Sequence, residues 1–279
     1  MIQKALYTLA LCLIFAVSFA QSGDISFIPE IEASGSVEPF LFTTSTMTPN
    51  NTPWIVSYSG SYGNKLSRAF GFNGIDQQIG VKGYLGHRFT LYSYVAMGIE
   101  NETNSVVSAQ RAEIIRDFLG GKTTNGLRVG VGVGGGRDYS GVFSFVSRVT
   151  GSFESKRWKL SGNLLFEKAL SDDRDELDFI TSFGVQYSFS KSLCAGIETI
   201  GEDLEGLWDE EEAEGGAKIM LGPSLNYIPK SSRFSFSMSG GPVIRATQSE
   251  ITNPNAIREL PTGNGMILRA RMIFNISGS

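Results

Sequence analysis

Two runs of acidic residues are the first candidates for chemistry in this 279-residue chain. Clustered carboxylates can bind divalent cations or bias a pore mouth toward cations. The simpler interpretation is a solvated loop that carries like charges, and neither run has EF-hand spacing. We therefore expect two acidic loops and predict no metal site in either. The candidate residues are Asp172 and Asp173 in one run, and Asp209, Glu210, Glu211 and Glu212 in the other.

Two further motifs indicate chemistry only weakly. Gly130–Gly135 matches G-x-G-x-x-G, but a dinucleotide site needs a helix after this motif, and the following residues, Gly136–Gly141, indicate a turn into a strand. His87 is the only histidine, and we expect it in a short turn. A hydrolase or acyltransferase that uses histidine as its base is therefore disfavoured. We predict no catalytic residue and no cofactor.

The remaining candidates are charged residues that alternate with apolar ones. Successive side chains of a strand point to opposite faces, so these charges share the face opposite the apolar one. Arginines and glutamates on facing strands would either set a transverse field across a pore or form salt bridges that fill a narrow barrel. The candidate lumen-lining residues are Arg128, Arg148, Glu167, Glu198, Glu202, Arg269 and Arg271.

The strands that must position these charges are long. In Leu177–Glu202, aromatic and apolar residues alternate with small or polar ones on both sides of the polar turn Ser190–Ser192, which predicts a hairpin. Each arm has about ten residues, close to what a tilted strand needs to cross a bilayer. Strands of soluble proteins have roughly five or six. The hairpin is therefore long enough to span a membrane.

The pattern recurs and predicts about twelve strands, an even number as in bacterial outer-membrane barrels. The first three are expected at Pro53–Tyr62, Gly74–Leu85 and Arg88–Glu100. Gln110–Leu119 is ambiguous, because its propensities permit a short helix and Arg116 interrupts its apolar face. A strand is favoured there, since it preserves an alternation of short turns with longer loops such as 101–109. That alternation places both termini on the short-turn, periplasmic side.

Export is expected from the first residues. Met1–Ala20 has Lys4, an apolar run and a small-x-small cleavage site, which predicts a secretory signal peptide. Cys12 lies inside the apolar run, which disfavours a lipoprotein, and Cys194 is then the only cysteine left. The net charge of −4 and pI near 5.2 argue against nucleic acid as a partner. The expected division is a signal peptide (1–20), an irregular N-terminal segment (21–52) and a β-barrel (53–279).

The export signal and paired long strands resemble bacterial outer-membrane β-barrels of the porin-like kind. Gly196–Lys218 followed by Ile219–Tyr227 is similar to a hairpin that recurs in poorly characterised members of that group. The likeness covers most of the mature chain as architecture, and only this hairpin and Asn163–Glu176 as motif. It implies an all-β, antiparallel up-and-down transmembrane barrel in the outer membrane. A secreted β-sandwich is the alternative, because alternation alone does not separate the two folds.

Three functions follow from a membrane barrel. The first is a passive, porin-like channel for small solutes or ions, favoured by small residues on the polar faces such as Gly130, Gly132 and Ser237. The second is a structural or surface-interaction barrel, with a lumen plugged by residues 21–52. The third, an outer-membrane enzyme, is disfavoured by the single histidine. The expected partners are outer-membrane lipid and lipopolysaccharide, with no nucleic acid.

Overall fold

The structure is a computed structural model. It describes residues 38–48, 54–66, 69–120, 125–171, 178–202, 204, 217–229, 232–245 and 264–276, all within one unit of the chain, Glu32–Ser279. The predicted signal peptide and both predicted acidic loops (Asp172 and Asp173; Asp209 to Glu212) lie outside these ranges. Within them, no helix is both long and apolar enough to cross a membrane.

The described residues form twelve antiparallel strands, the number expected from the sequence. Each strand has between 10 and 14 residues. They are β1 (Trp54–Asn64), β2 (Gly74–Gly86), β3 (Phe89–Glu100), β4 (Val106–Leu119), β5 (Gly126–Arg137), β6 (Phe143–Glu154), β7 (Trp158–Ala169), β8 (Asp178–Ser188), β9 (Leu193–Glu202), β10 (Lys218–Tyr227), β11 (Phe234–Arg245) and β12 (Gly265–Ile276).

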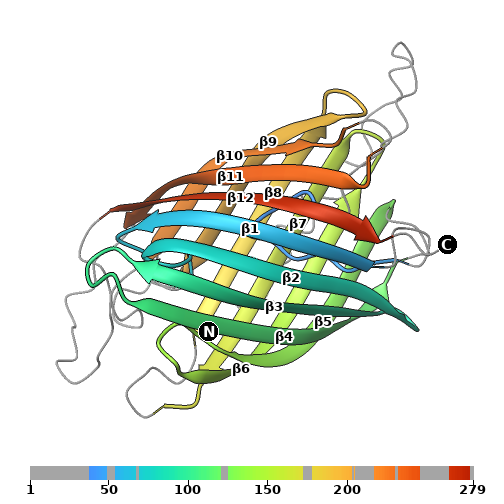
Figure 1. Cartoon of the computed structure of the whole chain (residues 1–279). Coiled ribbons are helices and arrows are strands. Elements are labelled where there is room, and N and C mark those ends of the chain that lie inside the picture. Colours follow the sequence, from blue (N-terminus) through green and yellow to red (C-terminus); the bar gives the residue numbers. More distant parts are fainter. Residues whose placement is uncertain are drawn as a thin grey trace. The chain divides into compact units, whose positions relative to one another are not determined.

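Each strand pairs with its neighbours in sequence, and β1 also pairs with β12, which closes the barrel (Figure 1). The closing ladder is unbroken from Trp54 opposite Ile276 to Asn64 opposite Met266. A closed barrel leaves no strand edge with unpaired backbone groups, and lipid offers such groups no hydrogen-bond partner. The fold is therefore the predicted up-and-down barrel and not a sandwich.

The connections match the expected alternation in most places. At the tightest turn, β2 and β3 are joined by His87 and Arg88, whose φ angles of 50° and 69° are both positive. Positive φ at both central residues is the mark of a type I′ hairpin turn. One expected long loop is wrong: β4 begins at Val106, so residues 101–105 form a connection shorter than the predicted Asn101–Ala109. The β-branched Val106 and Val107 extend the strand.

The two faces of the barrel reverse the arrangement of a soluble protein. On β5, Val131 and Val133 point outward with 42% and 63% exposure, whereas Arg128 between apolar neighbours is 2% exposed. The same alternation of exposed apolar and buried polar residues continues on β6, β10 and β11. An apolar exterior with a polar interior is the arrangement of a barrel in a bilayer.

The ambiguous stretch Gln110–Leu119 is part of β4, as favoured from the sequence. Arg116, the residue that interrupts its apolar face, points outward near the end of the strand. Its guanidinium lies 5.3 Å from the centroid of the Phe89 ring and 5.5 Å from that of Phe118. Aromatic faces stabilise a cation, and long side chains near a membrane surface extend their charge toward water. The arginine is thereby compatible with a lipid-facing strand.

For residues on the outward face, the cost of an introduced charge to the free energy of unfolding should depend on the depth of the residue in the membrane. Ile197 lies near the middle of β9 and is 50% exposed, so Ile197→Arg is expected to lower the free energy of unfolding by about 2–4 kcal/mol. The control Ile276→Arg, at the end of β12, is expected to cost about 1 kcal/mol or less. Denaturant unfolding in liposomes measures both. Equal costs at the two sites would contradict this assignment of depth.

Candidate functional site

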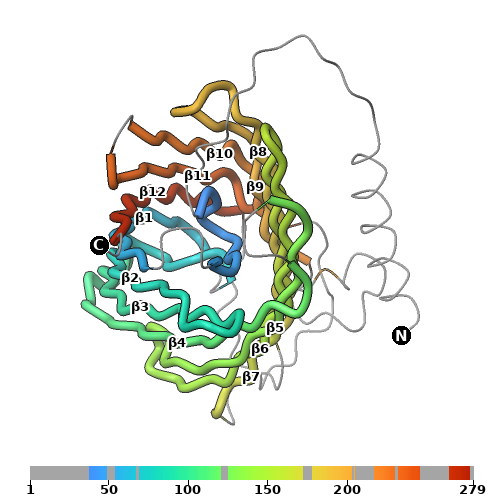
Figure 2. Tube along the Cα trace, turned by 90° about the vertical axis from the view of Figure 1, so that its right-hand side faces the viewer, coloured from blue at the N-terminus to red at the C-terminus, as the bar shows by residue number. Residues whose placement is uncertain are grey.

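The interior of the barrel holds a segment that belongs to no strand. Residues Glu38–Thr48, hereafter the lumen segment, lie inside the ring of strands, where Figure 2 shows them in blue. Nine of these eleven residues are buried, and Phe42 and Thr44 are intermediate. They fall within the irregular region 21–52 predicted from the sequence, and their position is the one considered for a plug.

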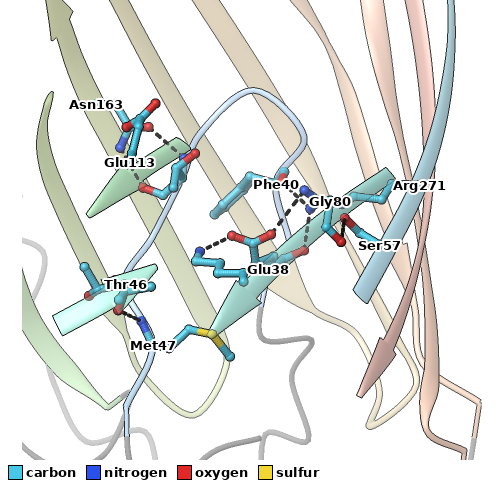
Figure 3. A network of polar contacts seen from close by, with 12 residues as sticks. Glu38, Phe40, Thr46, Met47, Ser57, Gly80, Glu113, Asn163 and Arg271 are labelled. Carbon is cyan, nitrogen blue, oxygen red and sulfur yellow. Dashed lines mark hydrogen bonds and ion pairs between the residues drawn. The ribbon is translucent and has the colours of Figure 1, made fainter. Parts of the chain in front are cut away.

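The lumen segment is a re-entrant loop whose two ends meet the same part of the barrel. Glu38 forms an ion pair with Lys82 near the end of β2, and the Met47 amide donates to Thr90 Oγ1 near the start of β3 at 2.9 Å. Lys82 and Thr90 both lie close to the short turn between β2 and β3. The middle of the segment reaches further, to Glu198 on β9. Both described ends of the loop therefore lie toward the short-turn end of the barrel, and its middle lies deeper (Figure 3).

Side chains of the barrel accept hydrogen bonds from the backbone amides of the lumen segment. Glu198 Oε1 accepts from Leu41 N at 2.7 Å and from Phe42 N at 3.0 Å. Asn163 forms a two-way contact with Thr44: its Oδ1 accepts from the amide at 2.6 Å, and its Nδ2 donates to the carbonyl at 2.8 Å. The carboxylate of Glu198 and the amide of Asn163 thus satisfy backbone groups of the lumen segment, as a neighbouring strand would in a sheet.

Other barrel side chains donate to the carbonyls of the same segment. These donors are cationic or amide groups, and each donor–acceptor distance is 3.4 Å or shorter. Hydrogen bonds from charged donors are stronger than those between neutral groups. The pairs are Arg271 with Glu38 and Phe40, Gln186 with Pro39, Arg269 with Leu41, and Arg128 with Thr46.

The side chains of the lumen segment are held less uniformly. The Thr46 hydroxyl contacts both carboxylate oxygens of Asp117 at 2.7 Å, and a β-carbon added at Gly184 would come within 2.5 Å of the Phe40 ring, so glycine makes room for that ring. By contrast, among the described residues, the buried Oγ1 atoms of Thr43 and Thr48 have no hydrogen-bond partner. Most of the directional contacts are therefore made by the peptide backbone.

A network of charges fixes the part of the barrel wall that faces Thr44. Arg148 binds Glu113 with two nitrogens, at 2.8 Å and 2.9 Å, and its third nitrogen donates to Asn163 Oδ1 at 3.0 Å. Arg111 adds an ion pair to Glu113 at 3.0 Å. A bidentate arginine–carboxylate pair restricts both side chains. The network holds Asn163 in the position from which it contacts the lumen segment.

Apolar clusters lie at both ends of this polar layer. Toward the short turns, Met47 packs with Ile55 and Ile273. At the other end, Leu66 and Phe70, from the connection between β1 and β2, pack inside the barrel with further buried apolar residues. Those residues are Ile200, Met220, Val243 and Ile267, and Phe42, Ala69 and Ile180 pack against the cluster. The described interior is thus filled by two apolar clusters and by the polar layer between them. From the sequence, the small residues on the polar faces had favoured open space.

The connection between β5 and β6 adds a polar contact near the same end. The Tyr139 hydroxyl donates to Asp76 Oδ2 at 2.9 Å, and the centroids of the Tyr139 and Phe72 rings are 4.4 Å apart. Burial, and then the neighbouring Asp76 carboxylate, raise the pKa of Tyr139 far above its usual value. The phenol therefore stays protonated and keeps its role as a donor.

The seven charged residues selected from the sequence divide into three groups. Arg128, Glu198, Arg269 and Arg271 contact the lumen segment directly, as given above. Arg148 supports it through Asn163. Glu167 binds Arg111 at 3.2 Å, and Glu202 pairs with Lys218 at 3.8 Å. Glu198 accepts from the amide of Leu41 and Arg269 donates to its carbonyl, so the segment bridges charges that were considered for a transverse field or for direct salt bridges.

Sequence reasoning did not select several residues that complete the site. Lys82, Asn163 and Gln186 fall on the polar faces of their expected strands, so their inward direction was readable. Glu113 lies in the stretch whose structure was ambiguous. Periodicity gives the face on which a residue lies but not its partner, and the lumen segment has no periodicity of its own.

Other chemistry receives little support from the described residues. They contain no group of three or more His, Cys, Asp or Glu side chains arranged to hold a metal ion. His87 is exposed in its turn, as expected from the sequence. Cys194 is buried, with its Sγ 3.3 Å from Ser188 Oγ. The glycine motif Gly130–Gly135 lies within β5, with no helix after it.

The charge network predicts an asymmetric response to substitution. Among the described residues, Arg148→Met leaves the buried Glu113 with Arg111 as its one remaining ion pair, and we expect a loss of about 3 kcal/mol in the free energy of unfolding. The double variant Glu113→Leu/Arg148→Met removes both charges and should recover most of that loss. Denaturant titration in detergent micelles measures both. A negligible loss for the single variant would mean that water reaches Glu113.

Comparison with known proteins gives a likeness of structure. No protein-family model matches the sequence, and a search of curated proteins finds no match. A structure of the NanC porin is similar with a TM-score of 0.55 and 9% identity, over 79% of this chain and 100% of that chain. A structure of the KdgM porin in complex with disordered oligogalacturonate gives 0.53 and 12%, over 80% and 99%. This chain therefore has the fold of porin-like outer-membrane barrels.

Proposed function

We propose that the protein is an outer-membrane channel for small hydrophilic solutes and that the lumen segment closes the passage in the conformation described here. The observation that carries this proposal is the interior layer of charged and amide side chains, which bind a segment that contributes no strand. Removing that segment breaks none of the twelve strand pairings. It would leave a polar surface that water can solvate.

The interior chemistry supports a path for polar solutes. Arg128, Arg271 and Glu198 are bound to peptide groups of the lumen segment, and water or a hydrophilic solute offers the same kinds of donor and acceptor. We propose that the seven selected charged residues line this path. KdgM and NanC are named porins, and the shared fold supports a channel without identifying its solute.

A permanently plugged, structural barrel is the second candidate. The apolar clusters favour it, because Phe70 and Met47 are buried at opposite ends of the interior and both ends must open for a solute to pass. An outer-membrane location, with the predicted signal peptide, is part of both proposals. Conductance separates them.

The first test is single-channel conductance in planar bilayers. The intact mature protein is expected to be silent for most of the recording. A full-length variant in which residues 38–48 are replaced by a Gly-Ser run of equal length with proline at positions 41, 42, 44 and 47, hereafter the Gly-Ser variant, is expected to conduct steadily. It removes Met47 from one apolar cluster, Phe42 from the packing of the other, and the four amide donors that bind the segment to the barrel. Silence of a correctly folded and inserted Gly-Ser variant would support the structural barrel. Steady conductance of the intact protein would mean that the lumen segment does not close it.

A point variant tests the same closure with the sequence otherwise intact. Gly184→Ala places a methyl group against the Phe40 ring, at 2.5 Å before any movement, and is expected to raise the open fraction at least about tenfold, the effect of roughly 1.4 kcal/mol. The matched control is Gly162→Ala, whose added β-carbon meets no atom closer than 3.4 Å. The same open fraction in both variants would argue against a closing role for Phe40.

A further inference from the structure

The barrel binds the lumen segment mainly through groups that every peptide possesses. The amides of Leu41, Phe42, Thr44 and Met47 donate to barrel side chains. The carbonyls of Glu38, Pro39, Phe40, Leu41, Thr44 and Thr46 accept from others. These contacts repeat along most of the segment. The interior thus binds the segment through its backbone, which bends at Leu41 and Phe42.

Few side chains of the segment are recognised in the same way. Glu38 pairs with Lys82 and Arg271, and Thr46 contacts Asp117. Among the described residues, the buried hydroxyls of Thr43 and Thr48 have no hydrogen-bond partner. A wall adapted to this one sequence would be expected to satisfy buried hydroxyls, because a lost hydrogen bond costs about 1–3 kcal/mol.

The barrel groups are built as a binding site and retain unused acceptors. They come from β3, β5, β7, β8, β9 and β12, and several are held by barrel partners: Asn163 by Arg148 at 3.0 Å, and Gln186 by Ser224 at 2.7 Å. Glu198 and Gln186 are 0% and 1% exposed. Among the described residues, Glu198 Oε2 and Gln186 Oε1 are buried without a hydrogen-bond partner. The site can therefore accept more N–H groups than the lumen segment supplies.

We propose that the lumen of this barrel is a binding site for oligopeptides in a bent, looped conformation, and that the lumen segment occupies it as a tethered competitor. Glu198, Asn163 and Thr90 accept from the amides of the bound peptide, and Arg271, Arg269, Gln186 and Arg128 donate to its carbonyls. This inference names a solute class for the proposed channel and rests on that function for transport. Binding itself requires no conductance.

The tether determines how the site must be tested. A segment joined to the barrel by a short linker competes at an effective concentration in the millimolar range. A free peptide at lower concentration is therefore expected to bind weakly to the intact protein. The full-length Gly-Ser variant defined above weakens this competition, because proline at positions 41, 42, 44 and 47 removes the four amide donors of the segment. It keeps the barrel residues. Circular dichroism and heat-dependent gel mobility can first check that the strands of this variant still form a closed barrel.

The test is fluorescence anisotropy of three labelled peptides with the Gly-Ser variant. The first has the sequence of residues 38–48, and the second is a scramble of it that keeps Glu38 and Pro39 in place. The third carries N-methyl groups at the positions of Leu41, Phe42 and Thr44. The scramble is expected to bind within about tenfold of the first peptide, because the backbone is unchanged. The methylated peptide is expected to bind at least about tenfold more weakly, since it lacks donors for Glu198 and Asn163.

Barrel variants give a second measurement that does not depend on peptide conformation. In the Gly-Ser background, Glu198→Gln is expected to weaken the binding of the first peptide about tenfold, because charged acceptors form the stronger hydrogen bonds. Asp76→Asn is the matched control: Asp76 is also a buried, interior-facing carboxylate, but its described partners are Ser61 and Tyr139. We expect it to bind the peptide like the parent variant.

The outcomes separate this inference from the proposed channel. No binding of the first peptide to a folded Gly-Ser variant, or equal binding of the methylated peptide, would overturn the peptide site even if that variant conducts. Binding with the expected pattern in a variant that does not conduct would support the site and contradict the channel. In a conducting variant, the first peptide should also block the current, with the same order of potency among the three peptides.

Discussion

The pairing of β1 with β12 is the constraint on which the rest of the structure depends. The ladder between them removes the two edges that a twelve-stranded sheet would otherwise have, and lipid provides no partner for the backbone groups of an edge. Closure also divides the side chains into an outer and an inner set, because successive residues point to opposite sides. The apolar exterior and the charged interior both follow from that division.

A charged interior then needs partners of its own. Glu113 is satisfied by arginines from the wall, whereas Glu198 has the amides of the lumen segment. The segment thus compensates inward-facing charges without adding a strand, and the wall compensates the segment's peptide groups in return. Burying either without the other would leave unsatisfied polar groups, which are costly in a low-dielectric interior. The two form one polar unit between two apolar clusters.

The sequence predicted the strands far better than it predicted the site. The number of strands and the direction of residues such as Val133 and Arg128 follow from a period of two, which is a local property. Gln110–Leu119 was ambiguous because Arg116 broke that period, and its contacts with Phe89 and Phe118 resolve the difficulty. The contacts of the lumen segment join residues that are far apart in the sequence, such as Leu41 and Glu198. Contacts between backbone and distant side chains leave no repeating pattern, so a plug could be considered from the sequence but its contacts could not be deduced.

The re-entrant course of the lumen segment has a consequence for the order of assembly. A chain that passed through the barrel from one mouth to the other would have to be surrounded by the strands as they closed. Here Glu38 and Met47 both lie against the β2–β3 hairpin, so the described loop can enter a ring that is already complete. Folding of the wall and insertion of the loop are therefore topologically separable, and the loop can be the last part to reach its place.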